Sequence, residues 1–324
     1  MTVRRLLVVR NDRLGDLVLT LPLLEAAREA FPDVRVAVLV KAYTAPLLQS
    51  HPHVDELLVD RNEEPLALGR RLARGRYDAA LVVNTNTRNC LAVFRANVPL
   101  RVTWSHRPAG LLLGNRHVHM HRSRPPVHES EFAMAFLRRL GVEARVRPPR
   151  LTPPPLPEHL RAELAGEGPL FAMAPGSGGS AYNWPPERYA ELAARLAAHG
   201  RVLVTGSAAE APLLERVHRM LPPEARTRAH FHHDLSLPEL AAALAEADAF
   251  TASSTGSLHL AAAVGTHVVG LFSPHPAHVP AKWGPLGEGH TVFVAPLREG
   301  EEPHSEVMLR IGVDEVVAAN LRAV

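Results

Sequence analysis

A charged turn, Asn11-Asp12-Arg13-Leu14-Gly15-Asp16, lies between the first apolar run of the chain and an apolar helix. Asp16 stands at the start of that helix, where exposed amides and the helix dipole stabilise a carboxylate. It is either a helix cap or a general base, for which Gly15 would let a ligand approach closely. No GxGxxG motif follows the run, which argues against a nicotinamide or flavin dinucleotide in the first half of the chain.

Two later loops have the composition of anion sites. The first, Gly176-Ser177-Gly178-Gly179-Ser180, offers backbone amides and hydroxyl groups without bulk, as a phosphate requires. It is not a Walker motif because no GK[ST] follows, and a flexible turn before a Pro-started helix is an equally good interpretation.

The second loop, at residues 253–257, ends an apolar strand with Ser253, Ser254 and Thr255 and continues through Gly256 into a helix of small residues. Amides at that helix start, together with the hydroxyl groups, would suit a diphosphate. His259 lies on the first turn, where it is either an ordinary helix residue or part of the same site.

Short apolar runs alternate with amphipathic stretches, which predicts βαβ units and parallel sheets covered by helices. Helices are expected up to about Phe31, after the run 34–40 and around residues 66–74. The proline-rich segment 148–157 interrupts the alternation and predicts an extended connector. We therefore expect an α/β protein of two doubly wound domains, 1–147 and 158–305, followed by a helix within 306–324. Ligands of such sheets bind beyond the carboxyl ends of the strands.

Composition limits the classes of protein. The net charge is +3, only Lys41 and Lys282 are lysines, and 19 histidines add charge below neutrality. We see no dense basic stripe with aromatics for nucleic acid; anionic small molecules or a lipid headgroup surface fit better. Without a signal peptide, a membrane span or a second cysteine beside Cys90, a cytoplasmic protein is expected. The histidines at 117, 119 and 121 and at 230, 232 and 233 do not make a convincing metal site.

Five segments resemble glycosyltransferase family 9, the heptosyltransferases. RNDRLGDLVLTLPLLEAAREAFP is similar to the amino-terminal signature, and PGSGGSAYNWPPERYAELAARL and STGSLHLAAAVGTHVVGLFSP are similar to two donor-domain signatures. HESEFAMAFLRRLGV and DLSLPELAAALAEAD also fit, in the expected order. The resemblance implies a GT-B fold of two Rossmann-like domains with an interdomain cleft, acceptor on the first and nucleotide sugar on the second, no required metal or cofactor, and a C-terminal helix able to pack back on the first domain.

Residue by residue, the resemblance makes Asp16 the base and puts Arg13 and Gly15 on the acceptor side. Two positions depart from the family: Ser254 stands where an Asp is usual, and Tyr182 where a Lys is usual. A Tyr hydroxyl cannot equal the charge-assisted contact of a Lys with a diphosphate. The donor-binding residues implied are Ser177, Gly178, Tyr182, Glu210, Ser254, Thr255, Gly256, Ser257 and His259.

The resemblance implies an inverting transfer of a sugar, a heptose on ADP, to a lipopolysaccharide-type or envelope glycan acceptor. The segment Arg101–Pro126 is either a solvated basic loop or a surface facing that anionic acceptor. Peripheral contact with the inner face of the membrane is expected for a lipid-linked acceptor. Two alternatives stay open: a nucleotide- or glycan-binding protein that has lost catalysis, suggested by Ser254 and Tyr182, and a nucleotide-sugar epimerase.

Overall fold

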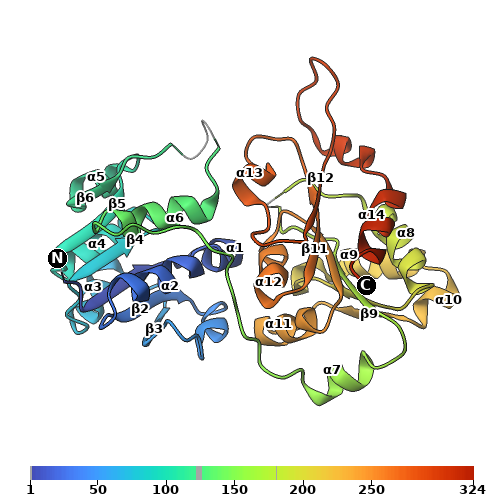
Figure 1. Ribbon diagram of the computed structural model, residues 1–324, viewed down its shortest axis with the longest axis horizontal. Helices are drawn as coiled ribbons and strands as arrows, with labels where there is room; N and C mark the ends of the chain where they lie inside the picture. Colours follow the sequence, from blue (N-terminus) through green and yellow to red (C-terminus); the bar gives the residue numbers. More distant parts are fainter. Residues whose placement is uncertain (1, 122–125, 180) are drawn as a thin grey trace. The chain divides into compact units, whose positions relative to one another are not determined.

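The computed structural model describes residues 2–121, 126–179 and 181–324, so Ser180 of the Gly/Ser loop and Arg122 and Arg124 of the basic segment lie outside the described part. The chain divides into two compact units, Met1–Pro149 and Arg150–Val324 (Figure 1). The division falls inside the proline-rich segment, where the fixed φ of proline disfavours both helix and sheet.

Among the described residues, the first unit contains a six-stranded parallel sheet in the order β3-β2-β1-β4-β5-β6. Its strands are β1 (Arg5–Val9), β2 (Arg35–Lys41), β3 (Glu56–Asp60), β4 (Ala79–Val82), β5 (Leu100–Trp104) and β6 (Arg116–Val118). Its helices are α1 (Leu14–Val18), α2 (Leu21–Ala30), the 3₁₀ turn η1 (Ala45–Leu48), α3 (Pro65–Ala73), α4 (Thr87–Arg95), α5 (Pro108–Leu113) and α6 (Glu129–Arg138).

Strand β1 is central in this sheet. Leu6 pairs with Val36 of β2 on one side and with Ala79 of β4 on the other, and β1 is buried from Leu6 to Val9. Strands covered on both faces are expected to be apolar, as β1 is from Leu6 to Val9. The strand order reverses between β1 and β4, and ligands of open parallel sheets bind at the carboxyl ends of strands at such a point. The charged turn after β1 lies at this position.

The second unit repeats the arrangement, with a described sheet of six parallel strands ordered β12-β11-β10-β7-β8-β9. Its strands are β7 (Leu170–Ala174), β8 (Arg201–Thr205), β9 (Ala229–His232), β10 (Ala249–Ser253), β11 (His267–Phe272) and β12 (Thr291–Val294). Its helices are α7 (Glu158–Glu163), α8 (Pro186–Ala197), η2 (Ala208–Glu210), α9 (Ala211–Met220), α10 (Pro223–Arg226), α11 (Leu237–Ala245), α12 (Gly256–Val264), α13 (Pro280–Trp283), η3 (Ser305–Arg310) and α14 (Val313–Leu321). Here the reversal lies between β7 and β10, which are followed by the two loops with anion-site composition.

The C-terminal helix α14 packs on the second unit. It lies beside α8 (Figure 1) and also contacts β10 and β11. Val316 and Val317 join the apolar core of that unit, and Asn320 exchanges hydrogen bonds with Thr251 of β10 at 2.9 and 3.0 Å. An Arg195–Asp314 ion pair joins α8 to α14 at 2.5 Å.

Two helices differ from the sequence expectation. The helix expected up to Phe31 is two helices: α1 ends at Val18, and α2 begins at Leu21 with Pro22 in its first turn. Thr20, between them, donates its hydroxyl to the Asp16 carbonyl at 2.8 Å. The helix expected after β2 is only the 3₁₀ turn η1. The first break is useful, because it leaves α1 as a short separate element carrying Asp16.

Within the described ranges, no helix combines the length and the apolarity that crossing a bilayer would require.

Candidate functional site

Asp16 lies in the first turn of α1 at the reversal point of the first sheet. Its side chain is 16% exposed, so the carboxylate is accessible at one side and held at the other. Gly15 is buried beneath it and Arg13, the residue before α1, is exposed. Arg13 makes no side-chain cap bond to the helix. The structure thus brings Arg13, Gly15 and Asp16 to one edge of the sheet.

Arg10, directly after β1, organises this edge and was not singled out from the sequence. Its guanidinium is almost fully buried and donates to Asp16 twice, to the backbone carbonyl at 3.0 Å and to Oδ1 at 2.8 Å. It also donates to Glu129 Oε1 at 2.6 Å and lies 3.3 Å from Asp12 Oδ2. Burial lowers the pKa of Arg10, but the carboxylates of Asp12, Glu129 and Asp16 outweigh burial and raise it above its ordinary value. Arg10 is therefore a fixed positive charge that holds Asp16 in place.

A second polar network lies beside it at the ends of β1, β3 and β4. The Asn11 amide donates to Asp60 Oδ2 at 2.5 Å and exchanges hydrogen bonds with Asn89 at 2.7 and 3.1 Å. Arg88 donates to both Asp60 oxygens at 2.7 and 2.9 Å. Burial raises the pKa of Asp60, yet the bonds from Arg88, Asn62 and Asn11 outweigh it, so that the pKa is lowered. A network in which these polar groups bond one another holds the ends of β1, β3 and β4 in fixed positions.

In the second unit, Thr255 caps helix α12. Its hydroxyl accepts the backbone N–H of Leu258 at 3.4 Å and lies 2.9 Å from the Ser257 hydroxyl. Gly256 and Ser257 open the helix, so their backbone N–H groups have no partner within it. His259 is 3% exposed on the same turn. Hydroxyl groups and helix amides of this kind bind phosphate oxygens.

The Gly/Ser loop follows β7, the neighbour of β10. Gly178 and Gly179 have φ of 53° and 74°, a region that favours glycine. Glu210 accepts the Gly178 N–H at 3.1 Å and the Ser207 N–H and hydroxyl at 2.8 Å each. A Cβ at Gly176 would overlap with Oε1 of Glu210. Glu210, expected as a donor contact, therefore also links the loops after β7 and β8.

Tyr182 lies at the far end of this loop against residues that the sequence reading missed. Its ring is 5.9 Å from the ring of His275 and 5.5 Å from that of His278, in edge-to-face arrangements. The two histidine rings are 4.9 Å apart. His275 and His278 follow β11, so the loops after β7 and β11 meet across the end of β10. Their place directly after an apolar strand is the signal in the sequence that could have identified them, since ligands of parallel sheets bind at the carboxyl ends of strands. The segment that resembles the family ends at Pro274, just before them.

Two further missed residues, Lys282 and Trp283, lie on α13. The Trp283 ring is 6.5 Å from the His259 ring, and Lys282 Nζ lies over Trp283 at 5.5 Å from the ring centroid. Burial, His275 and Lys282 together lower the pKa of His278 below its ordinary value. His278 is therefore neutral at pH 7, and Lys282 is a fixed positive charge close to the cluster.

The second sheet edge thus collects the residues expected for the donor, and the first collects those expected for the base and acceptor. The residues gathered at the second edge are Ser177, Gly178, Tyr182, Glu210, Ser254, Thr255, Gly256, Ser257 and His259.

Where the structure describes them, the two edges lack the ligands of a metal site. Across the described residues, no group of three or more His, Cys, Asp or Glu side chains could hold a metal ion. His230 and His232 of β9 instead contact the Glu163 carboxylate at 3.3 and 3.0 Å. His117 lies in β6, with His119 beyond its end.

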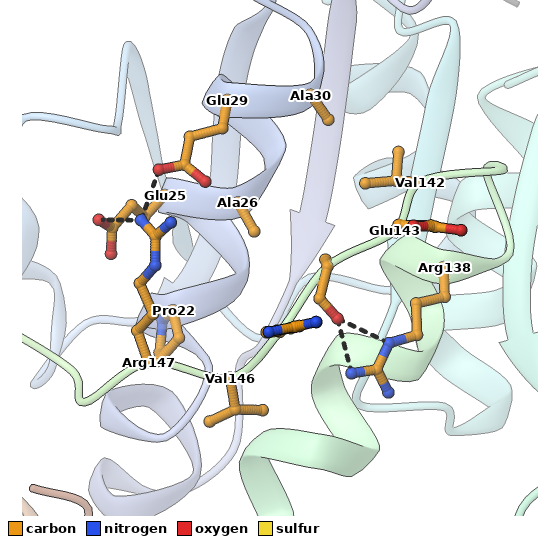
Figure 2. Close-up of a pocket in the computed structure, with 12 residues that line it drawn as sticks. Pro22, Glu25, Ala26, Glu29, Ala30, Arg138, Val142, Glu143, Val146 and Arg147 are labelled. Atoms are coloured by element: carbon orange, nitrogen blue, oxygen red, sulfur yellow. Dashed lines mark hydrogen bonds and ion pairs between the residues drawn. The ribbon is translucent and has the colours of Figure 1, made fainter.

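A groove of about 1000 Å³ lies elsewhere in the first unit, between α2 and the segment after α6 (Figure 2). Arg147 there pairs with Glu25 and Glu29 at 3.0 and 2.5 Å, and Arg138 donates to the Ala144 carbonyl at 2.7 and 2.9 Å. Because these groups satisfy one another and none of the residues singled out from the sequence lines the groove, we place no site in it.

Two doubly wound parallel sheets, each with loops suited to a ligand at the point where its strand order reverses, define a GT-B protein. Comparisons with known proteins support this class. A family model for glycosyltransferase family 9 (heptosyltransferase) matches residues 65–309. The chain belongs to this family and is a heptosyltransferase-like glycosyltransferase.

Relatives are similar along most of the chain. Lipooligosaccharide heptosyltransferase 2 of Haemophilus influenzae is 27% identical over 320 residues, covering 91% of this chain and 89% of the relative. The structure of Escherichia coli ADP-heptose LPS heptosyltransferase II superposes with a TM-score of 0.81 at 24% identity, covering 98% and 99% of the two chains. That of E. coli heptosyltransferase WaaC with ADP superposes with a TM-score of 0.77 at 21% identity, covering 99% and 100%.

Proposed function

We propose that this protein transfers a heptose from an ADP-linked donor to a lipopolysaccharide-type acceptor, with inversion at the anomeric carbon. The first unit takes the acceptor and the second takes the donor. Relatives named for ADP-heptose and for lipopolysaccharide, and one solved with ADP, support the choice of donor and acceptor. The observation that carries the proposal is the accessible carboxylate of Asp16, held by Arg10 at the reversal point of its sheet.

In the proposed reaction, Asp16 accepts the proton of an acceptor hydroxyl as its oxygen attacks the anomeric carbon. The bond from that carbon to the diphosphate breaks, and ADP leaves with the electron pair. A positioned base contributes about 10²- to 10⁴-fold to such a reaction. The ion pair with Arg10 keeps the carboxylate oriented before substrate arrives, which avoids reorganisation during the step.

On the donor side, the amides at the start of α12 and the hydroxyls of Thr255 and Ser257 would bind the diphosphate and stabilise the charge that develops on it. Tyr182 occupies the position where the family usually has a lysine. We propose that Lys282, together with His278 when it is protonated, provides positive charge there instead.

The test is a transfer assay with ADP-heptose and lipopolysaccharide from a heptose-deficient strain, read by ADP release and by the mass of the acceptor. We expect both signals to rise together, and to persist in EDTA because the proposed chemistry uses no metal. ADP release without a heavier acceptor would reject transfer to this acceptor.

The replacement of the family lysine by Tyr182 favours one second candidate, a nucleotide-binding protein without turnover. Calorimetry with ADP separates the two. Tight ADP binding with no transfer to any acceptor would support the binding protein, and transfer by the same preparation would exclude it.

We also propose that the first unit contacts the membrane surface from the cytoplasmic side while it takes a lipid-linked acceptor. Leu111 and Leu112 on α5 are 54% and 79% exposed, and exposed Arg107 and Arg116 flank them. Apolar side chains with a basic rim suit anionic headgroups. Co-sedimentation with vesicles of phosphatidylglycerol should fall for Leu112→Ser and at high salt; equal sedimentation of the variant would reject α5 as the contact.

A further inference from the structure

The segment HESEFAMAFLRRLGV, which fits the family but has no role in the proposed mechanism, forms helix α6. Its first residue, Glu129, is 0% exposed, although a buried carboxylate is costly unless it is paired. His128 caps the helix, its Nδ1 accepting the Ser130 N–H at 3.3 Å, and a carboxylate in the first turn is favoured by the helix dipole. The carboxylate of Glu129 accepts from Arg10 at 2.6 Å.

One nitrogen of Arg10, Nη2, serves both Glu129 and Asp16, at 2.6 and 2.8 Å. The same side chain also binds the Asp16 backbone carbonyl through Nε at 3.0 Å. Three hydrogen bonds from two nitrogens of one rigid guanidinium plane therefore fix α1 and the Asp16 carboxylate relative to α6. Glu129 in turn fixes Arg10, because a buried arginine without a partner at that position would be strongly unfavourable.

This arrangement also bears on how strong a base Asp16 can be. An arginine next to a single carboxyl group lowers the pKa of that group by about one to three, so the carboxylate becomes a weaker base. Here Glu129 accepts from the same guanidinium nitrogen as Asp16 and adds a second negative charge beside it. A second carboxylate on one guanidinium offsets part of the Arg10 charge, so that Arg10 can orient Asp16 with a smaller loss of basicity than it would cause alone.

We propose that Glu129 is a positioning residue that, through Arg10, orients the Asp16 carboxylate and keeps it basic enough to accept the proton of the acceptor hydroxyl. The inference rests on the proposed function for the catalytic role of Asp16, but the coupling of Glu129 to Asp16 can be measured without any turnover.

The other charged and titratable groups facing Asp16 come from three segments. Asp12 and Arg13 lie in the turn before α1, and Asp12 is 3.3 Å from Arg10. Tyr43, after β2, donates its hydroxyl to the Asp12 carbonyl at 3.4 Å, and burial raises its pKa above the ordinary value. His128 adjoins Glu129 on α6. Asp12 lies beside Nη1 of Arg10, whereas Glu129 accepts from Nη2, the nitrogen that also binds the Asp16 carboxylate, so Glu129 is the group whose removal should change Asp16 most selectively.

The first measurement is the titration of the Asp16 carboxyl carbon by NMR in protein labelled with ¹³C-aspartate, assigned with Asp16→Asn. In Glu129→Gln the amide keeps the shape of the side chain but has no charge, so the Arg10 guanidinium stabilises the Asp16 carboxylate more strongly. We expect its midpoint to fall by about one pH unit. Glu131→Gln is the matched control, because Glu131 lies on the same helix but pairs with the partly exposed Arg138; its Asp16 midpoint should stay where it is in the unmodified protein.

A buried substitution can prevent folding, so a second variant removes both charges. Arg10→Met combined with Glu129→Leu replaces the pair by apolar side chains, a change that buried pairs often tolerate. Asp16 then loses its cationic partner, and its midpoint should rise. Opposite shifts in the two variants would be hard to produce by general loosening of the fold. An unmoved midpoint in the folded Glu129→Gln protein, or a fall in the double variant, would overturn the proposal.

The second measurement is the pH dependence of kcat for transfer from ADP-heptose. In Glu129→Gln we expect the acidic limb to move to lower pH with the NMR midpoint and the plateau to fall about 3- to 10-fold, with KM for the donor unchanged. An unchanged profile would overturn the catalytic part of the inference. No transfer by the unmodified protein, with the NMR shift still present, would instead reject the proposed function and support the coupling.

Discussion

At the reversal point of the first sheet, a buried arginine gathers three carboxylates, whereas at the same point of the second sheet there are glycines, hydroxyl groups, helix amides and two histidine rings. Both sheets have the same strand order. The first edge is charged and closely bonded, as a fixed general base requires. The second offers small groups with little side-chain charge, as suits a ligand that brings its own negative charge. One fold therefore presents two different chemistries, and only the loops decide which.

The largest expected effect distinguishes the role of the first sheet edge in transfer from the role of the second in ADP binding. Asp16→Asn should lower transfer by about 10²- to 10⁴-fold because the base is lost, while ADP binding changes little. Steady-state assays and calorimetry with ADP measure the two quantities. Asp33→Asn, an exposed change in the same unit, is the control and should leave both unchanged. Near-normal transfer by Asp16→Asn would show that Asp16 is not the general base.

At the second edge, Thr255→Val should weaken ADP binding by about tenfold, because the change removes both a helix cap and a hydroxyl group. Thr255→Ser should restore most of the affinity. Thr227→Val is the matched control, since Thr227 precedes β9 and lies at the opposite edge of the sheet. Equal ADP affinity in Thr255→Val and the unmodified protein would show that the diphosphate does not bind at the start of α12.

Tyr182→Lys should give the second edge the lysine that the family resemblance leads one to expect at this position. A lysine placed there supplies a charge-assisted contact, so ADP should bind about 3- to 10-fold more tightly by calorimetry at low salt. Tyr182→Phe removes only the hydroxyl and is the control for the aromatic contacts with His275 and His278. If Tyr182→Lys binds no better than Tyr182→Phe, this position lies outside the reach of the diphosphate.

The smallest effect is a pH dependence confined to the second edge. Burial, with His275 and Lys282, lowers the pKa of His278, so this histidine is neutral at pH 7 and becomes charged only as the pH falls below its ordinary range. Affinity for ADP should therefore rise a few-fold on acidification. His275→Ala combined with His278→Ala should show only the dependence that comes from ADP itself; identical profiles of the two proteins would exclude a role for the histidines.

The sequence by itself determined the two parallel sheets, because apolar runs alternating with amphipathic stretches have few other solutions. It also identified the loops at both reversal points, and with them Asp16, Thr255, Gly256 and the Gly/Ser loop. It did not determine where α1 ends and α2 begins, a break at which Thr20 and Pro22 lie. Local patterns identify elements well and their ends poorly.

Only the tertiary structure decided which side chains that are far apart in the sequence form ion pairs or ring contacts. Arg10 and Glu129 are 119 positions apart, and nothing in either segment indicates an ion pair. Tyr182 meets His275 and His278 only because the loops after β7 and β11 converge across β10. Pattern and periodicity are short-range properties of the chain, whereas electrostatics acts through space. The position of the proposed base could therefore be predicted from the sequence, but the groups that orient it and set its basicity could not.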